Sequence, residues 1–153
     1  MTDLTEGAKA PDFELESADG PVRLSDFAQR TLVLYFYPKD DTPGCTTEAK
    51  DFSALADDFA KAGATVVGVS KDSVKRHQNF AAKYGLAVRL ASDPEGQVIE
   101  RYGSWVEKSL YGRKYMGIDR STFLIKDGKV VKAWRKVKVP NHAQAVLEAA
   151  KSA

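Results

Sequence analysis

The sequence predicts an α/β fold in which helices cover both faces of a mixed central sheet, and three observations support this. Two short apolar runs, Thr31–Tyr37 and Ala64–Ser70, are rich in β-branched and aromatic residues, as is typical of buried strands. Each run is followed by a segment with apolar residues at helical spacing, which indicates two βα units. Later in the chain, Asp127-Gly128 separates two further strand-like stretches and predicts an antiparallel hairpin. A chain of 153 residues with this composition is expected to form one domain, residues 1–153.

The other elements follow from local patterns along the chain. Ser73 and Asn141 are suitable helix N-caps, and Gly63 and Gly85 are typical of helix ends. The stretch Gly103–Gly117 holds three aromatic residues and no clear element, so we expect a loop that covers the core edge as a flap. The remaining expected elements are an N-terminal β-hairpin around Asp19-Gly20-Pro21, a helical turn at Ser25–Phe27, helices Thr46–Ala62 and Ser73–Tyr84, strand Val88–Ala91, a helical segment from Asp93 to Tyr102, strands Ser121–Lys126 and Lys129–Arg135, and helix Asn141–Lys151.

This order of elements, two βα crossovers followed by a hairpin and a helix, is that of the thioredoxin-like folds. In that plan the Ser121–Lys126 strand pairs antiparallel with the Thr31–Tyr37 strand. The start of the later strand then lies beside the end of the earlier one. Arg120 immediately precedes the later strand, so we expect its side chain near the segment that follows Tyr37.

That segment contains the only cysteine, Cys45. The turn formers Asp40–Gly44 precede it and an apolar helical pattern follows, so Cys45 is expected at the first turn of a helix. Free N–H groups and a partial positive charge there favour a thiolate. A helix end supplies only ~0.3–1 kcal/mol, whereas each tenfold gain in thiolate requires ~1.4 kcal/mol. A reactive thiol therefore needs a further donor, preferably an arginine. A lone cysteine is often an inert buried residue, but the strand–turn–helix context favours the reactive alternative.

The same segment resembles a known family. The pattern Pro38-x-x-x-Thr42-x-x-Cys45 matches the peroxidatic motif of peroxiredoxins. The longer string Tyr-Pro-Lys-Asp-Asp-Thr-Pro-Gly-Cys-Thr-Thr-Glu-Ala resembles the bacterioferritin comigratory protein, or peroxiredoxin Q, subfamily. The string Gly117–Phe123 resembles the arginine motif of peroxiredoxins.

The resemblance implies that the chain is a thiol peroxidase with Cys45, Thr42 and Arg120 as catalytic residues. The thiolate would attack the terminal oxygen of a hydroperoxide, while Thr42, the N–H groups near Gly44 and Arg120 donate to the polarised oxygens. Pro38 is expected to shape the substrate pocket and Glu48 to orient Arg120. No metal, haem or flavin cofactor is implied.

In one respect the sequence departs from the subfamily. Many members have a second cysteine five residues after the first, where this chain has Lys50, and others have it near Ala81 or Ala82. With one cysteine no internal disulfide can form. We therefore expect a one-cysteine enzyme whose sulfenic acid is reduced by glutathione or by a thioredoxin- or glutaredoxin-type protein. A Cys45–Cys45 disulfide between two chains is geometrically less favoured.

Two other function classes stay open. Cys45 could belong to a peroxide-sensing regulatory module, in which oxidation is a signal rather than a turnover step. The chain could also be a holdase or structural thioredoxin-like protein with an unreactive cysteine.

The composition and charge of the chain give no sign of a membrane, nucleic-acid or metal partner. Apolar residues make up 43% and charged residues 29% of the chain, no run is long enough to span a membrane, and the polar start Met1–Gly7 does not resemble a secretory signal. We expect a cytoplasmic protein, and a monomer because no predicted surface helix is strongly apolar on two faces. Basic residues outnumber acidic ones ten to two between Lys108 and Lys138, which we interpret as a solvated sheet edge rather than a nucleic-acid site. His77 and His142 lie in no metal-ligand spacing and are expected at the surface or as helix caps.

Overall fold

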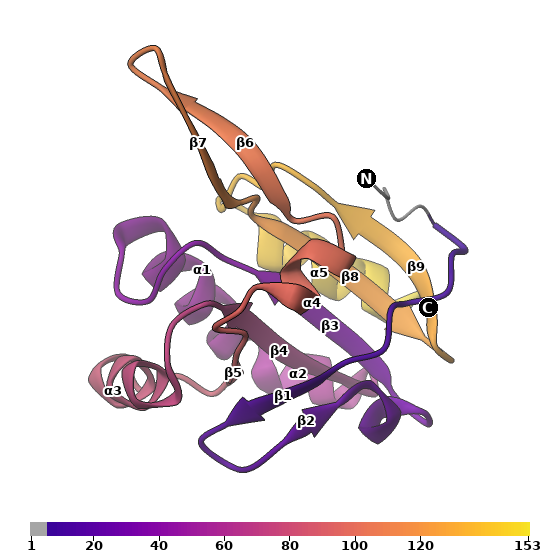
Figure 1. The fold of residues 1–153 in the computed structure, drawn as a ribbon. Coiled ribbons are helices and arrows are strands. Elements are labelled where there is room, and N and C mark those ends of the chain that lie inside the picture. The colour runs from indigo at the N-terminus through magenta and orange to yellow at the C-terminus, as the bar shows by residue number, and fades with distance from the viewer. Residues whose placement is uncertain (1–5) are drawn as a thin grey trace.

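A seven-stranded mixed sheet forms the centre of the protein in a computed structural model that describes residues 6–153 (Figure 1). Its strand order is β2-β1-β5-β4-β3-β8-β9, and β6 and β7 form a separate two-stranded sheet. The strands are β1 Glu14–Ser17, β2 Val22–Arg23, β3 Thr31–Phe36, β4 Ala64–Ser70, β5 Arg89–Ser92, β6 Trp105–Leu110, β7 Arg113–Ile118, β8 Ser121–Lys126 and β9 Lys129–Trp134. The predicted thioredoxin-like α/β fold with an N-terminal hairpin is confirmed.

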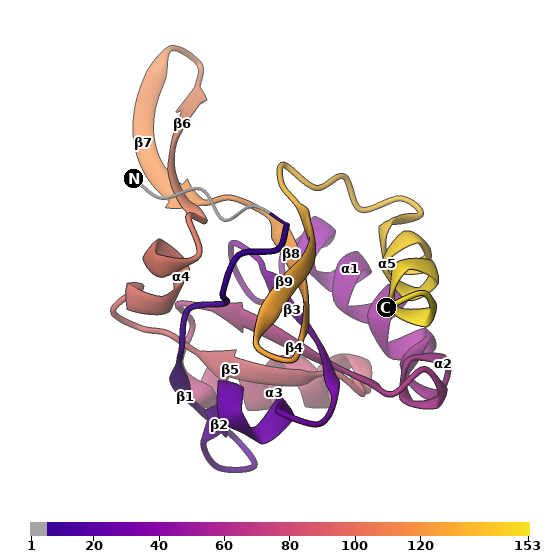
Figure 2. The same ribbon diagram turned by 90° about the vertical axis from the view of Figure 1, so that its right-hand side faces the viewer.

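Helices lie on both faces of this sheet, as predicted (Figure 2). On one face, α1, α2, α3 and α5 pack on Val33, Tyr35 and Leu124. On the other face, α4 and η1 cover alternate residues of the same strands, such as Leu34 and Phe123. The helices are η1 Leu24–Phe27, α1 Pro43–Ala54, α2 Ala56–Lys61, α3 Val74–Tyr84, α4 Gln97–Arg101 and α5 His142–Lys151.

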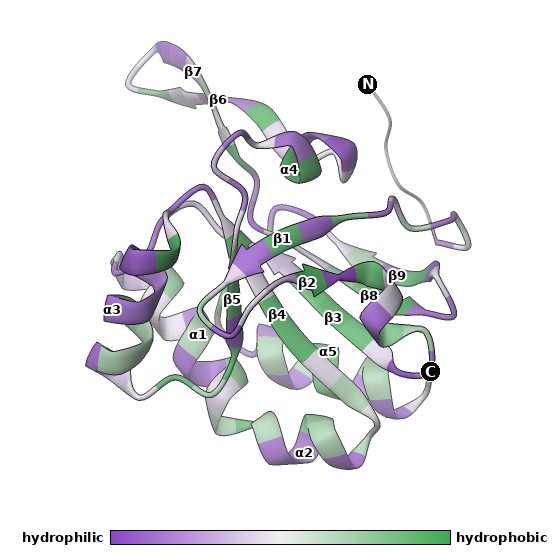
Figure 3. Cartoon of the chain, turned by 60° about the horizontal axis from the view of Figure 1, so that its bottom comes forward, coloured by the Kyte–Doolittle hydropathy of each residue, from purple (hydrophilic) through white to green (hydrophobic). Residues whose placement is uncertain are grey.

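The central strand β3 is buried along its whole length, which explains its continuous apolar sequence. Hydrophobic residues gather on β3 and β4 in Figure 3, while hydrophilic ones mark the outer helix α3. β3 pairs in parallel with β4 and antiparallel with β8, and Phe36 at its end lies opposite Ser121 at the start of β8. This register brings Arg120, the residue before β8, to the end of β3.

The predicted helix Thr46–Ala62 is instead two helices, and it begins earlier. α1 begins at Pro43, because proline has no N–H to lose at the first helical position and its fixed φ suits a helix start. The chain leaves helical geometry at Leu55, whose N–H bonds to Phe52 and Ser53, and α2 follows at once. The earlier start places Cys45 third in α1, within the first turn.

The expectation of a loop packed as a flap over Gly103–Gly117 is wrong. This stretch forms the β6–β7 hairpin, which projects away from the rest of the protein in Figures 1 and 2. Its turn residues Tyr111 and Gly112 have φ values of 51° and 77°, the positive values that a tight hairpin turn requires. Tyr111 is 97% exposed, and only Trp105 and Ile118 at the base join the core.

The predicted cap residues are found at α3 and α5. The Ser73 side chain accepts a hydrogen bond from the N–H of Arg76, and Gly85 ends α3 in the left-handed conformation. Asn141 is the N-cap of α5, as predicted, but its side chain makes no capping hydrogen bond. Within residues 6–153, no helix is both long enough and apolar enough to cross a bilayer. Residues 1–5 of the predicted polar start lie outside the described residues.

Candidate active site

Cys45 lies in the first turn of α1, directly after the loop that leaves β3. Its side chain is buried, with the residue only 1% exposed. Thr42 is the N-cap, and its carbonyl accepts the N–H of Thr46 at 2.8 Å. The N–H of Cys45 itself has no partner within the helix, because the first turn leaves its donors free. The sulfur therefore lies at the positive end of the helix dipole.

Arg120 reaches this sulfur from β8. Its Nη2 donates to Cys45 Sγ at 3.3 Å, and its side chain is 17% exposed. The antiparallel register of β3 and β8 produces this contact, so the predicted placement of Arg120 beside Cys45 is confirmed. The guanidinium supplies the charged hydrogen-bond donor that the thiolate needs in addition to the helix end.

Glu48 holds the other side of the same guanidinium. Arg120 Nη1 donates to Glu48 Oε1 at 2.6 Å, and the Glu48 side chain is 1% exposed. Burial raises the pKa of Glu48 to about 7, although the charge and hydrogen bond of Arg120 act in the opposite direction. Glu48 Oε2 has no hydrogen-bond partner among the described residues. The expected contact between Glu48 and Arg120 is thus present, in a half-satisfied buried pair.

The charge on Arg120 is secure in this site. Burial works against it, but Glu48 and Cys45 more than offset that effect, and the pKa of Arg120 is raised above its usual value. One guanidinium therefore faces two groups that can carry negative charge, the Glu48 carboxyl and the Cys45 thiol.

Gly44 permits the close approach of Arg120 to the helix start. A Cβ added at Gly44 would lie 3.2 Å from Arg120 Nη2, closer than almost all real contacts. A side chain at this position would push the guanidinium away from the sulfur.

Thr42 and Pro38 are placed differently from the other predicted site residues. Thr42 Oγ1 donates to the carbonyl of Lys39 at 2.9 Å, and the described residues show no hydrogen bond from it to Cys45. Its proton is therefore engaged, while its oxygen lone pairs remain available. Pro38 is exposed at the start of the loop. The structure thus brings Cys45, Gly44, Glu48 and Arg120 together, with Thr42 at the N-cap and Pro38 apart at the surface.

A buried histidine anchors the loop before Cys45. His77 was expected at the surface or as a cap, but it is 2% exposed, so that prediction is wrong. Its Nδ1 lies 2.6 Å from Asp40 Oδ2, and its Nε2 lies 3.0 Å from the carbonyl of Ala91. Tyr37 OH donates to the other oxygen of Asp40 at 2.5 Å. The sequence did contain a signal for this burial: His77 lies three residues before Phe80, so both side chains fall on the inner face of α3.

A second contact ties the same loop to α3. Asp41 accepts hydrogen bonds from Lys83 Nζ at 2.8 Å and from Tyr84 OH at 2.6 Å, and its φ is 59°. The two aspartates appeared in the sequence only as turn formers. In the structure they hold the loop against α3 from neighbouring positions.

His142, also expected at the surface or as a cap, is the first residue of α5 and is buried, so that prediction is wrong too. Its Nε2 lies 2.8 Å from Thr122 Oγ1, and its ring meets Phe52 and Trp134 edge to face. Burial, followed by the nearby charge of Arg120, lowers the pKa of His142 to about 4. The imidazole is therefore neutral at pH 7.

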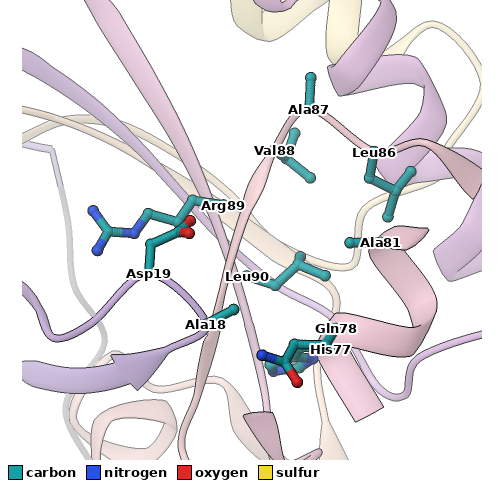
Figure 4. A pocket seen from close by; sticks show the side chains of 10 residues that line it. All are labelled: Ala18, Asp19, His77, Gln78, Ala81, Leu86, Ala87, Val88, Arg89 and Leu90. Atoms are coloured by element: carbon teal, nitrogen blue, oxygen red, sulfur yellow. The ribbon is translucent and has the colours of Figure 1, made fainter. Parts of the chain in front are cut away.

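A separate pocket is lined in part by His77 and does not include Asp40. Figure 4 shows it between α3, β5 and the turn at Ala18 and Asp19, with Leu86, Val88 and Leu90 among its apolar lining and a volume of about 370 Å³. Neither Cys45 nor Arg120 lines it. Among residues 6–153, no group of three or more His, Cys, Asp or Glu side chains could hold a metal ion.

A buried cysteine at a helix start, bonded to an arginine on a thioredoxin-like fold, defines a thiol-dependent redox protein. A model of the AhpC/TSA family matches residues 7–133, and the chain belongs to that family. It is 50% identical to peroxiredoxin Bcp of Xanthomonas campestris pv. campestris over 99% of this chain and 98% of the relative. It is 48% identical to peroxiredoxin Bcp of Bacillus subtilis, over 95% and 94% of the two chains.

Solved structures of peroxiredoxin Q proteins show the same similarity. Xanthomonas campestris peroxiredoxin Q superposes with a TM-score of 0.89 at 50% identity, over 97% of this chain and 96% of that one. One structure of the Xanthomonas protein concerns its alkyl peroxide reduction, with trapped intermediate and ligand complexes. Two others are cysteine-to-serine variants at two different positions, so that protein has at least two cysteines. The present chain has only Cys45.

Proposed function

We propose that this protein is a thiol-dependent peroxidase that reduces hydrogen peroxide and organic hydroperoxides at Cys45. The observation that carries the proposal is the hydrogen bond from Arg120 Nη2 to Cys45 Sγ at the N-terminus of α1. The alkyl peroxide reduction described for the Xanthomonas relative supports organic hydroperoxides as substrates. Residues 1–153 would act as one peroxidase domain.

In the first half-reaction the Cys45 thiolate attacks the terminal oxygen of ROOH. An S–O bond forms as the O–O bond breaks, the attacked oxygen keeps its hydrogen, and the product is Cys45–SOH. The electron pair leaves with RO⁻, which takes a proton from water and departs as ROH. Negative charge thus moves from the sulfur to the leaving oxygen, and the catalytic site has to stabilise it along that path.

Arg120 and the free N–H groups of the first turn of α1 are the donors that lie along this path. A buried guanidinium already beside the sulfur needs little reorganisation when the charge shifts to oxygen. The role proposed for Thr42 changes from that expected at first. Because its proton is donated to Lys39, its oxygen is set to accept the O–H of the hydroperoxide and so to orient the attacked oxygen.

Glu48 acts through Arg120 and is a positioning residue. The short contact at Oε1 keeps the guanidinium fork in the plane from which Nη2 reaches the sulfur. Gly44 leaves room for that fork.

In the second half-reaction an outside thiol reduces Cys45–SOH, since the chain has no second cysteine. Position 50, a site of the second cysteine in related proteins, is an exposed lysine that lies 5.7 Å from the centre of the Tyr84 ring. We propose a thioredoxin- or glutaredoxin-type protein, or glutathione, as the reductant, acting on a cytoplasmic monomer.

The test is peroxide consumption by the wild type and by Cys45→Ser with the thioredoxin, glutaredoxin and glutathione systems in parallel. The wild type should turn over with at least one system, and Cys45→Ser with none. Oxidation of Cys45 without recycling by any system would indicate a sensor instead. Slow, alkylation-insensitive Cys45 would indicate a structural role.

A further inference from the structure

The β6–β7 hairpin holds most of the large hydrophobic side chains that are exposed among the described residues. Four of the five large hydrophobic side chains that are exposed among residues 6–153 belong to it: Leu110 at 56%, Tyr111 at 97%, Tyr115 at 48% and Met116 at 49%. Among the described residues, only the base of the hairpin joins the hydrophobic core, and the hairpin extends beyond the rest of the fold in both ribbon views (Figures 1 and 2). Apolar side chains gathered on a projecting element are typical of a protein interaction site.

The two faces of the hairpin differ in charge. Residues opposite each other in an antiparallel pair point to the same side, so Lys108 pairs with Tyr115 and Leu110 with Arg113 on one face. We call Val106, Lys108, Leu110, Arg113 and Tyr115 the basic–apolar face; it contains no acidic residue.

On the opposite face of the hairpin, positive and negative charges balance, and the base packs against the core. There Glu107 and Lys114 form an ion pair at 3.8 Å, and Trp105 and Ile118 join the core at the base. Met116 on this opposite face is also exposed, but only on the basic–apolar face do exposed apolar side chains, Leu110 and Tyr115, lie beside positive charges that form no ion pair among the described residues.

The base of the hairpin adjoins Arg120. The N–H of Asp119 donates to the carbonyl of Ser104 at 2.7 Å and closes the base, and Arg120 is the next residue. The loop after β9 runs beside it, because the N–H of Val137 donates to the carbonyl of Arg120 at 2.9 Å. That loop exposes Lys136 and Lys138, which add to the positive charge around the site. Part of the basic stretch, Lys136 and Lys138, thus lies on the loop beside Arg120.

We propose that the basic–apolar face is the docking surface for a protein reductant, a small dithiol protein with acidic residues around an apolar contact surface. The inference rests on the proposed function: because the chain has no second cysteine, the reductant has to act directly on Cys45–SOH and so has to dock next to the catalytic site. Charge favours this occupant over a second copy of the chain, because a symmetric contact through this face would bring two positively charged faces together.

The docked partner would reduce Cys45 in two exchanges. One thiolate of the partner attacks the sulfur of Cys45–SOH, a mixed disulfide forms, and hydroxide leaves and is protonated to water. The second thiolate of the partner then attacks the partner's own sulfur in that disulfide. Cys45 leaves as a thiolate, reduced by two electrons relative to the sulfenic acid, and the partner leaves oxidised as a disulfide.

The test compares matched variants of the two faces. Arg113→Glu with Tyr115→Ser changes the basic–apolar face, and Lys114→Glu with Met116→Ser makes the same charge change on the opposite face. Three rates are measured for each: sulfenic acid formation with one equivalent of peroxide, reduction of that acid by dithiothreitol, and steady-state turnover with an acidic bacterial thioredoxin, its reductase and NADPH.

We expect the first two rates to stay within twofold of wild type in both variants. In the Arg113/Tyr115 variant the KM for thioredoxin should rise at least tenfold with little change in kcat, while the Lys114/Met116 variant should stay within threefold. The wild-type KM should also rise with salt, and that dependence should weaken in the Arg113/Tyr115 variant.

Equal KM values for the two variants would overturn the docking proposal, as would a wild type that turns over with dithiothreitol and not with thioredoxin. Light scattering that shows a wild-type dimer dissociated by Arg113→Glu and Tyr115→Ser would assign the face to a second copy instead. Failure to form a sulfenic acid at all would contradict the proposed function, and the normal first half-reaction separates that failure from a failure of docking.

Discussion

Arg120 Nη2 lies 3.3 Å from the sulfur of Cys45, although 75 residues separate the two in the chain. The contact exists because β8 pairs antiparallel with β3, so that Ser121 sits opposite Phe36. The strand pairing of the fold therefore places the cation, and the loop from Pro38 to Thr42 with the start of α1 places the thiol at the same point.

Replacing Arg120 by alanine should slow sulfenic acid formation by one to two orders of magnitude. A lost charged donor costs ~2 kcal/mol or more when the charge it served stays buried. The thiolate fraction at pH 7, followed by ultraviolet absorbance, should fall in the same variant. Arg120→Lys should recover little, because one ammonium cannot serve Sγ and Glu48 together as the guanidinium fork does. If Arg120→Ala left both the thiolate fraction and the rate of sulfenic acid formation unchanged, Arg120 would have no role in the mechanism.

Glu48 should make stability fall as the pH rises from 4.5 to 7. Its pKa is raised from 4.5 to about 7 by burial, so folding favours the protonated carboxyl. The contribution is complete below 4.5 and is lost by about 7, up to roughly 3 kcal/mol. The free-energy difference between the wild type and Glu48→Gln, from urea unfolding at several pH values, isolates this term. A difference that is constant across the range would show that Glu48 ionises normally.

His142 should act in the opposite direction. Burial and the charge of Arg120 lower its pKa from 6.5 to about 4, so folding favours the neutral ring. Its contribution is complete above 6.5 and falls by up to roughly 3 kcal/mol as the pH drops to 4. His142→Gln keeps a polar side chain without the titration, so the wild type should lose its advantage over that variant on acidification. Direct NMR titration of the imidazole provides an independent check.

The Asp40–His77 contact should be far more costly to break than the neighbouring Lys83–Asp41 pair. Both join the loop before Cys45 to α3, but the first pair is 2% exposed or less and the second is 58% and 38% exposed. Removing one partner of a buried pair costs ~3–5 kcal/mol, whereas an exposed pair contributes little because water screens it. His77→Ala should therefore lower the free energy of unfolding by several kcal/mol, and the control Lys83→Ala should change it far less. Similar losses in the two variants would place the anchor of the loop elsewhere.

Sequence reasoning succeeded where a topology or a long motif constrained the answer. The position of Arg120 followed from the antiparallel pairing of β3 with β8, because the order of elements in the chain already predicts that pairing. His77 was missed because a polar residue on a helix is usually exposed, and only its partner Asp40, 37 positions away, makes burial favourable. The β6–β7 hairpin was missed because its cross-strand pairs bury little, so its apolar and basic residues alternate without a core-facing pattern.

Because position 50 is a lysine, Cys45 has no second cysteine in its own chain with which to form a disulfide. One equivalent of peroxide without any thiol should leave Cys45 as a monomeric sulfenic acid, and excess peroxide should carry it to sulfinic and sulfonic acids. Adding glutathione should instead give a mixed disulfide, and intact mass distinguishes all of these species. A covalent dimer in high yield would contradict the outside-thiol model, since Cys45 of a second chain would then be the resolving group.

The Lys50→Cys variant tests the same step from within the chain. Residues five apart are about 7.5 Å apart along a helix axis, beyond the ~6.8 Å Cα separation that a disulfide tolerates. Cys45 and a cysteine at position 50 both lie in α1, so they can join only if the first turn unwinds. We expect peroxide to give an internal disulfide in this variant, seen as a loss of two hydrogens by mass, at a rate set by that unwinding. Lys50→Ser is the matched control and should behave as the wild type. A persistent sulfenic acid in Lys50→Cys would show that α1 stays closed over the oxidised sulfur.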